Sequence, residues 1–403
     1  MVTIVITLYF VFIALLSIET TKLWLPFEKY EASRIYPSDP NLPSIAVGNF
    51  PRNRQGFYNQ QMAFSAIIMR ISDMTKATKT KRFYQILLPS IVFRDYLGTG
   101  KLVAFEKLFD VEHWNSFVPR LPRLVSFNQS QHFQFSLKNR RMVNSSSSIN
   151  GDDRIIRPYT HPEFLEEDRP AFATYTAYLH SLQNGSTLHP ADQLILEGAL
   201  RPAPVVQAAI DEITERNTNY IAIHLRIEQD YLCHPWAEPL IKGRNLTQIF
   251  QHIEESLGNP PPADRCFIAV NRALLENPNM LPNDAQPSES ACQAERRDNL
   301  QALNRVIQKG LWGGRVKVFE RPPLKNHSLF RDRPVAFASL MDSEICRNAK
   351  IFVGRLGSTF TLNTIRRRSA IGLTENYNYE SPGFDQVYGM AYPKVIARRN
   401  AMS

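Results

Sequence analysis

Residues 221–230 read IAIHLRIEQD, a run in which apolar and polar side chains alternate. In an extended chain neighbouring side chains point to opposite faces, so one face is apolar and the other carries His224, Arg226 and Glu228. We expect a buried strand that ends near Glu228, with Arg226 close to its carboxyl end. Two explanations of the charges stay open: an ion pair of Arg226 with Glu228 or Asp230, or a phosphate bound by the planar guanidinium group.

Strands and helices alternate through the rest of the second half. Further apolar runs predict strands at 265–270, 316–320 and 350–354, and helical periodicity predicts helices at 245–257, 293–309, 335–348 and 359–368. This alternation is typical of a mostly parallel sheet with helices on its faces. In the first half, strands expected at 44–50 and 83–89 enclose a helix that begins near Asn59, which makes a βαβ unit. The sequence therefore predicts an α/β fold of two Rossmann-like halves.

Length and composition fit a globular protein of two domains. The chain has 403 residues, of which 43% are hydrophobic and 21% are charged. We expect domains at 44–218 and 219–403, with a polar loop at 127–160 in the first. The net charge of +9 favours acidic partners such as phosphate-bearing ligands. No basic run is interleaved with aromatic residues, so nucleic acid is not an expected partner.

The start of the chain predicts entry into the secretory pathway. Residues 2–18, VTIVITLYFVFIALLSI, carry no charge, so 1–21 is expected to be a signal anchor or a signal peptide, followed by a stem at 22–43. Both alternatives put the body of the chain in the lumen of the Golgi or the endoplasmic reticulum, and an anchor makes it a single-pass membrane protein. Five N-x-[ST] sequons agree with that compartment. The four cysteines allow two disulfides or four buried thiols, and their spacing does not indicate zinc.

A second candidate site lies in KIFVGRLGSTF, residues 350–360. An expected strand ends at Gly354, and Ser358 and Thr359 stand at the expected start of a helix. Backbone N–H groups at a helix start form a ready anion site. The alternative is an ordinary helix cap, because Ser and Thr are common N-cap residues.

A third candidate lies in QGFYNQQ, residues 55–61, directly after the first expected strand. Gly56 permits close approach of a ligand to the backbone, and Asn59 offers an amide donor and acceptor. A plain helix start capped by Asn59 explains the same residues without a ligand.

Taken together, these stretches resemble the motifs of the O-fucosyltransferase superfamily, which includes a large plant group. The matching stretches follow the family's order: QGFYNQQ, LLPSIVFRDY, FEKLFDVEHW, HLRIEQD and DSEICRNAKIFVGRLGSTF. The resemblance covers roughly residues 45–370. It implies a GT-B fold, in which two Rossmann-like domains face a cleft. It also implies an inverting transfer of fucose from GDP-fucose to a protein or glycan hydroxyl, with no metal or other cofactor required.

The resemblance further implies roles for single residues. Arg226 would hold the donor pyrophosphate with help from His224, and Arg226, Glu228 and Asn59 are the expected catalytic residues. The expected donor-binding residues are His224, Arg226, Asp342, Ser358, Thr359, Phe360, Gly56 and Asn59.

Two departures from the family pattern leave part of the chemistry open. Lys350 stands where some members carry an acid, so the choice of nucleobase is open. Residues 51–62 contain no carboxylate, so either Glu228, Asp230 or Glu106 would have to act as the base, or the acceptor is activated without a strong base. The alternatives are an inactive relative that binds a nucleotide sugar or glycan, a transferase that uses another nucleotide sugar, and a membrane-tethered scaffold.

Overall fold

The computed structural model describes most of the second half of the chain and parts of the first. The described residues are 44–45, 57–58, 60–61, 64–65, 68, 85–88, 92–94, 102–118, 120–126, 190–227, 245–276, 290–324, 330–356 and 358–387. The expected segments 1–21 and 22–43 and the expected loop at 127–160 lie outside them. None of the described helices is long and apolar enough to cross a membrane.

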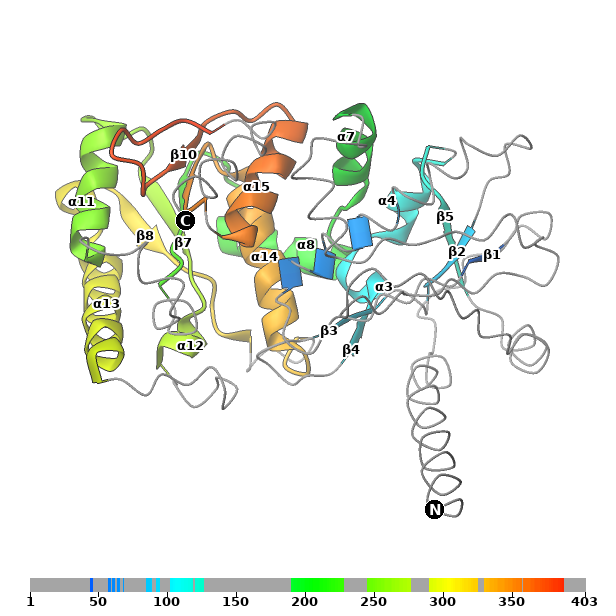
Figure 1. Cartoon of the computed structure of the whole chain (residues 1–403), viewed down its shortest axis with the longest axis horizontal. Coiled ribbons are helices and arrows are strands. Elements are labelled where there is room, and N and C mark those ends of the chain that lie inside the picture. The colour runs from blue at the N-terminus through cyan, green and yellow to red at the C-terminus, as the bar shows by residue number, and fades with distance from the viewer. Residues whose placement is uncertain are drawn as a thin grey trace, which may run out of the picture.

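A five-stranded sheet forms the centre of the described second half (Figure 1). Its strands are β6 (Ile221–His224), β7 (Arg265–Ala269), β8 (Lys317–Phe319), β9 (Ile351–Gly354) and β10 (Asn376–Asn378). The spatial order is β10-β9-β6-β7-β8, and all neighbouring strands are parallel, as the sequence predicts. The first strand is therefore central, and the chain changes direction across the sheet after β8. The connection after β6 leads to β7 on one side, and the connection after β9 leads to β10 on the other side. Open α/β sheets bind ligands at the carboxyl ends of two such neighbouring strands.

Helices connect these strands and cover both faces of the sheet. The helices after β6 and β7 are α11 (Leu246–Leu257), α12 (Arg272–Glu276) and α13 (Ser290–Lys309), and those after β8 and β9 are α14 (Pro334–Asn348) and α15 (Thr359–Ala370). A 3-10 turn, η5 (Trp312–Gly314), precedes β8. The four helices predicted in this half are confirmed, with ends shifted by a few residues. A capping box starts α11, because the side chains of Asn245 and Gln248 each accept a hydrogen bond from the other's backbone N–H.

The side chains of β6 alternate between the two faces of the sheet, as predicted. A hydrophobic cluster with α11 and α13 contains Ile221 and Ile223 of β6, and Leu225 and Ile227 just beyond it. Tyr220 and Ala222 belong to a second cluster, which contains residues of α14 and of the first half of the chain. His224 therefore lies on the face of the sheet that α14 and α15 cover.

The prediction for the end of this strand was wrong. β6 ends at His224, not near Glu228. The backbone N–H of Leu225 still donates to the Ala269 carbonyl at 3.0 Å, but β7 itself ends at Ala269. The chain therefore leaves the sheet just before Arg226, and this arginine lies in the connection beyond the strand.

The described part of the first half holds a parallel sheet in the order β1-β2-β5 and an antiparallel pair, β3 and β4. The strands are β1 (Ser44–Ile45), β2 (Gln85–Leu87), β3 (Val92–Arg94), β4 (Leu102–Ala104) and β5 (Arg123–Val125). The helices are α3 (Phe105–Leu108), α4 (Val111–Asn115), α7 (Pro190–Ala199) and α8 (Pro204–Thr214). The predicted βαβ unit is confirmed, because β1 pairs in parallel with β2 and the described residues among 57–68 between them are helical.

The two halves share a hydrophobic core. One cluster of buried side chains extends from Phe57 in the first half to Phe352 in β9 and Phe360 in α15. Helix α7 contacts α15, and α8 contacts α14 (Figure 1). The domain boundary expected near residue 218 follows α8 and stays a prediction.

The basic run at 366–368 lies inside this interface and is not a surface patch. Arg367 is fully buried and forms ion pairs with Glu344 of α14 and with Glu197 of α7, the second at 3.5 Å. Arg366 also pairs with Glu197. A buried charge is tolerated when it is paired and hydrogen-bonded, so this ion cluster ties α15 to one helix from each half.

Arg368 joins the end of α14 to the edge of the sheet. Its fully buried guanidinium donates to the carbonyls of Cys346, Arg347, Ala349 and Lys350. It also donates to Asn376 Oδ1 in β10, at 2.5 Å. Burial lowers the pKa of Arg368 to about 10, so the side chain stays charged at neutral pH. The last carbonyls of a helix lack partners within the helix, and here one arginine satisfies several of them.

The alternative with two disulfides is wrong. Cys266 and Cys346 are both free and buried, whereas two disulfides would need all four cysteines. Burial raises the pKa of both thiols, which keeps them protonated and unreactive.

Candidate functional site

The site is built where β6 and β9 end side by side. His224 is the last residue of β6 and Gly354 is the last residue of β9. Helix α15 begins directly beyond β9, with Ser358 as its N-cap residue. We call the edge of the sheet formed by the carboxyl ends of β6 to β10 the carboxyl edge. At this edge the H-L-R stretch (224–226) and the S-T-F stretch (358–360) of the sequence lie next to each other.

Two consecutive residues of α15 hold the His224 ring. Its Nδ1 lies 2.8 Å from Thr361 Oγ1, and its ring stacks on Phe360 with centroids 4.1 Å apart and an interplanar angle of 10°. Tyr58, from the first half, packs edge-on against Phe360 at 4.7 Å between centroids. The Tyr58 hydroxyl donates to the Ser339 carbonyl in α14. Three stretches that lie far apart in the sequence therefore meet around one aromatic ring.

His224 is neutral at physiological pH. Burial lowers its pKa from 6.5 to about 3, and the positive charges of Arg226 and Arg355 add to this shift. The ring is therefore a neutral hydrogen-bonding group. Any help that it gives Arg226 in binding an anion must come from a hydrogen bond, not from a second positive charge.

The low pKa of His224 predicts how stability changes with pH. Between pH 6.5 and 3 the unfolded chain binds a proton that the folded chain excludes, so the free energy of unfolding falls as the pH falls. The expected contribution is about 1.4 kcal/mol per pH unit below the unfolded pKa. Urea unfolding between pH 7 and pH 5.5 measures this slope, and His224→Gln should reduce it. An unchanged slope in the variant would show that His224 titrates alike in both states.

Arginines follow four of the five strands at the carboxyl edge. They are Arg226 after β6, Arg272 after β7, Arg321 after β8 and Arg355 after β9. The ion pairs at this edge include Arg272 with Glu320 at 2.8 Å, Arg321 with Asp342 at 2.8 Å, and Arg355 with Glu380 at 2.6 Å. Sequence reasoning missed the last three arginines. The pattern that drew attention to Arg226, a cation just beyond an apolar strand, would have found them all.

The start of α15 adds backbone donors to this edge. Ser358 is extended and its side chain does not cap the helix, although its carbonyl accepts the Leu362 N–H at 3.0 Å. The first N–H groups of a helix have no partner within the helix, and the helix dipole favours an anion there. The nucleotide-sugar donor was expected to bind near Ser358, Thr359 and Phe360. These three residues therefore lie where an anion would be stabilised.

The remaining predicted site residues have different surroundings. Asp342 is buried in α14 and accepts from Arg321, and burial raises its pKa while Arg321 opposes the shift. Glu106 lies in the first turn of α3. Gly56, Asn59, Glu228 and Asp230 lie outside the described residues.

Lys350 lies at the opposite edge of the sheet. It precedes β9, and its Nζ donates to the Pro262 carbonyl at 3.0 Å. A residue at this position is at the amino end of the strand, whereas the candidate site is at the carboxyl end. Lys350 therefore does not line the carboxyl edge, although it departs from the family pattern.

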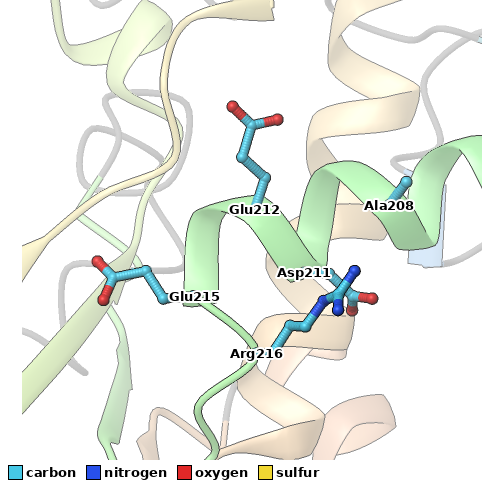
Figure 2. Close-up of a pocket in the computed structure, with 5 residues that line it drawn as sticks. All are labelled: Ala208, Asp211, Glu212, Glu215 and Arg216. Atoms are coloured by element: carbon cyan, nitrogen blue, oxygen red, sulfur yellow. The ribbon is translucent and has the colours of Figure 1, made fainter.

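An open hollow lies on α8, away from the carboxyl edge. It is lined by Ala208, Asp211, Glu212, Glu215 and Arg216. In Figure 2 the side chains of Glu212 and Glu215 point in different directions from the end of the helix. Glu215 pairs with Arg265, the first residue of β7, at 3.2 Å. The hollow thus adjoins the amino ends of the strands, and its acidic lining does not suit a phosphate.

The chain was compared with protein families, curated proteins and solved structures. No protein-family model and no curated protein matches the sequence. A crystal structure of POFUT1 in complex with GDP is similar at 15% identity and a TM-score of 0.43, over 85% of this chain and 99% of that chain. A structure of NodZ alpha-1,6-fucosyltransferase soaked with GDP-fucose is similar at 14% identity and a TM-score of 0.38, over 77% of this chain and 89% of that one. A structure of a mutant of Arabidopsis thaliana FUT1 in complex with GDP is similar at 11% identity and a TM-score of 0.38, over 89% of this chain and 74% of that one. Likeness of this degree assigns no activity to this chain.

Proposed function

We propose that this chain is an inverting glycosyltransferase that moves fucose from GDP-fucose to a hydroxyl group of a protein or glycan, without a required metal ion. One observation carries the proposal: His224, Phe360 and Tyr58 meet at the carboxyl edge. Each lies within a different one of the five stretches that resemble O-fucosyltransferase motifs. A GT-B arrangement, with two Rossmann-like halves facing a cleft, is part of the proposal.

The chemistry of the leaving group agrees with this edge. In the transfer, the acceptor hydroxyl attacks C1 of the sugar while the bond from C1 to the β-phosphate oxygen breaks, and negative charge develops on the departing diphosphate. Fixed donors and cations aimed at that charge stabilise the transition state. Arg226 would supply a planar cation, the start of α15 backbone N–H groups, and His224 a neutral hydrogen bond. Arg226 also suits a diphosphate better than a lysine would, because its fork can bind two oxygens.

In this proposal, residues of the first half of the chain bind the acceptor. Asn59 and its neighbours would contact donor and acceptor there, beside Tyr58, which packs on Phe360. The acceptor proton must pass to a base, and Glu228, Asp230 and Glu106 remain the candidates. The apolar start of the chain and its sequons support a reaction in the secretory lumen.

An assay of GDP release from GDP-fucose by the purified full-length protein, in the presence of EDTA and a panel of peptide and glycan acceptors, tests the proposal. We expect acceptor-dependent release from GDP-fucose and little from UDP- or CMP-sugars. Binding of GDP-fucose with no turnover on any acceptor would favour the inactive relative. Preference for another nucleotide sugar, or loss of activity in EDTA, would contradict the proposal as stated.

A further inference from the structure

Thr361 lies between two groups at the carboxyl edge. Its Oγ1 accepts a hydrogen bond from the backbone N–H of Arg355 at 3.2 Å and lies 2.8 Å from His224 Nδ1. All three residues are buried, with Thr361 at 0%, Arg355 at 2% and His224 at 4% exposure. The hydroxyl is therefore held by its neighbours and not by water.

The protons at this contact can be assigned one by one. A backbone N–H only donates, so the bond from Arg355 uses a lone pair of the Thr361 hydroxyl oxygen. That hydroxyl has one proton of its own, and among the described contacts of Thr361 its one acceptor is His224 Nδ1. When this hydroxyl donates to Nδ1, that nitrogen is unprotonated. Because the ring is neutral, its single proton is on Nε2.

Packing fixes the position of both partners. Phe360 stacks flat on the His224 ring, which sets the plane in which Nε2 points. A Cβ atom at Gly354 would lie 2.7 Å from both Oγ1 and Cγ2 of Thr361, so a larger residue there would displace the threonine. A glycine at the end of β9 thus makes room for the hydroxyl that contacts the end of β6.

We propose that Thr361 is a positioning residue, which fixes His224 as the Nε2–H tautomer and so makes it a neutral hydrogen-bond donor to a diphosphate oxygen of the nucleotide. This inference rests on the proposed function for the identity of the ligand. The opposite tautomer would present a lone pair at Nε2, which repels a phosphate oxygen. The choice of tautomer therefore decides whether the ring attracts the donor or opposes it.

The test uses the full-length protein with ¹⁵N-labelled histidine. NMR spectra of wild type and His224→Gln identify the His224 signals among the nine histidines of the chain. We expect a pyridine-type Nδ1 and a pyrrole-type Nε2 in wild type and in Thr361→Ser, which keeps the hydroxyl. In Thr361→Val, which has nearly the same shape without the hydroxyl, we expect mixed tautomers. GDP should bind Thr361→Val about tenfold more weakly and Thr361→Ser within about twofold of wild type.

The outcomes separate this inference from the proposed function. Wild type that binds GDP but carries the proton on Nδ1 would overturn the inference and leave the proposed function standing. Equal GDP affinity of Thr361→Val and Thr361→Ser would also overturn it. Wild type with the Nε2–H tautomer but no GDP binding would overturn the proposed function and the diphosphate as ligand, while the role of Thr361 in fixing the tautomer would hold. If Thr361→Val does not fold, the wild-type and Thr361→Ser spectra still decide the tautomer.

Discussion

Replacing Arg226 by alanine is expected to lower kcat/KM for transfer from GDP-fucose by about 10²–10³, the usual effect of removing one group that stabilises developing charge. Arg226 follows β6, whose last residue, His224, contacts the first turn of α15, and its charge contributes to the low pKa of His224. The variant loses a cation where the leaving diphosphate gains charge. Arg226→Lys should recover only part of the loss, because an ammonium group keeps the charge but not the planar fork.

Lys350→Ala is the matched control for Arg226→Ala. It also removes one positive charge, but from the amino end of β9, where Lys350 is exposed and contacts the Pro262 carbonyl. Its kinetics should stay close to wild type, and both variants should show wild-type circular dichroism. Equal activity of Arg226→Ala and wild type would remove Arg226 from the donor site. A large loss in Lys350→Ala would show that the opposite edge takes part in the reaction.

Replacing Glu344 by alanine is expected to lower the free energy of unfolding by about 3 kcal/mol, because the buried Arg367 loses its nearer carboxylate and keeps only Glu197, at 3.5 Å. Glu344 and Arg367 are both fully buried and form an ion pair between α14 and α15. Glu344 also accepts from Arg347 at 2.8 Å. The cost is the poorer compensation of the buried charge on Arg367, not the strength of the lost pair itself. Urea unfolding followed by tryptophan fluorescence measures the loss.

Glu276→Ala is the control for the buried pair. Glu276 also pairs with an arginine, Arg272, at 2.6 Å, but its side chain is 52% exposed. Exposed pairs of this kind contribute about 0–1 kcal/mol, so this variant should unfold close to wild type. If the two glutamate variants lost the same amount, the ion cluster between α14, α15 and α7 would not be the structural tie inferred here.

The strands and helices of the second half could be predicted because their signals are local. Apolar runs marked β6 to β9, and helical periodicity marked α11, α13, α14 and α15, within a few residues. The alternation of apolar and polar residues at 221–227 gave the correct faces of β6. The short helix α12 was missed. β10 was missed, since NYN at 376–378 is short and polar and is a strand only through pairing with β9.

The contacts of the site depend on pairs that are distant in the sequence. Nothing local to His224 shows that Thr361 is its partner, because that contact exists only once β6 and β9 lie side by side. The surroundings of charged residues were also misjudged, because they depend on contacts that are distant in the sequence. Arg367 and Arg368 look like a solvated run. Only the tertiary structure supplies the buried glutamates that form ion pairs with Arg367 and the carbonyls that accept hydrogen bonds from Arg368. Lys350 seemed to bear on the donor, but parallel topology puts it at the other edge.

Hydrogen exchange in the presence of GDP tests most directly whether the nucleotide binds at the carboxyl edge. GDP bound at the carboxyl edge and GDP bound at the opposite edge would protect different amides from exchange. The account predicts slower amide exchange at 221–227 and at 358–364 on adding GDP, with no change at 208–216 around the hollow on α8. Protection at 208–216 without protection at the ends of β6 and β9 would contradict it.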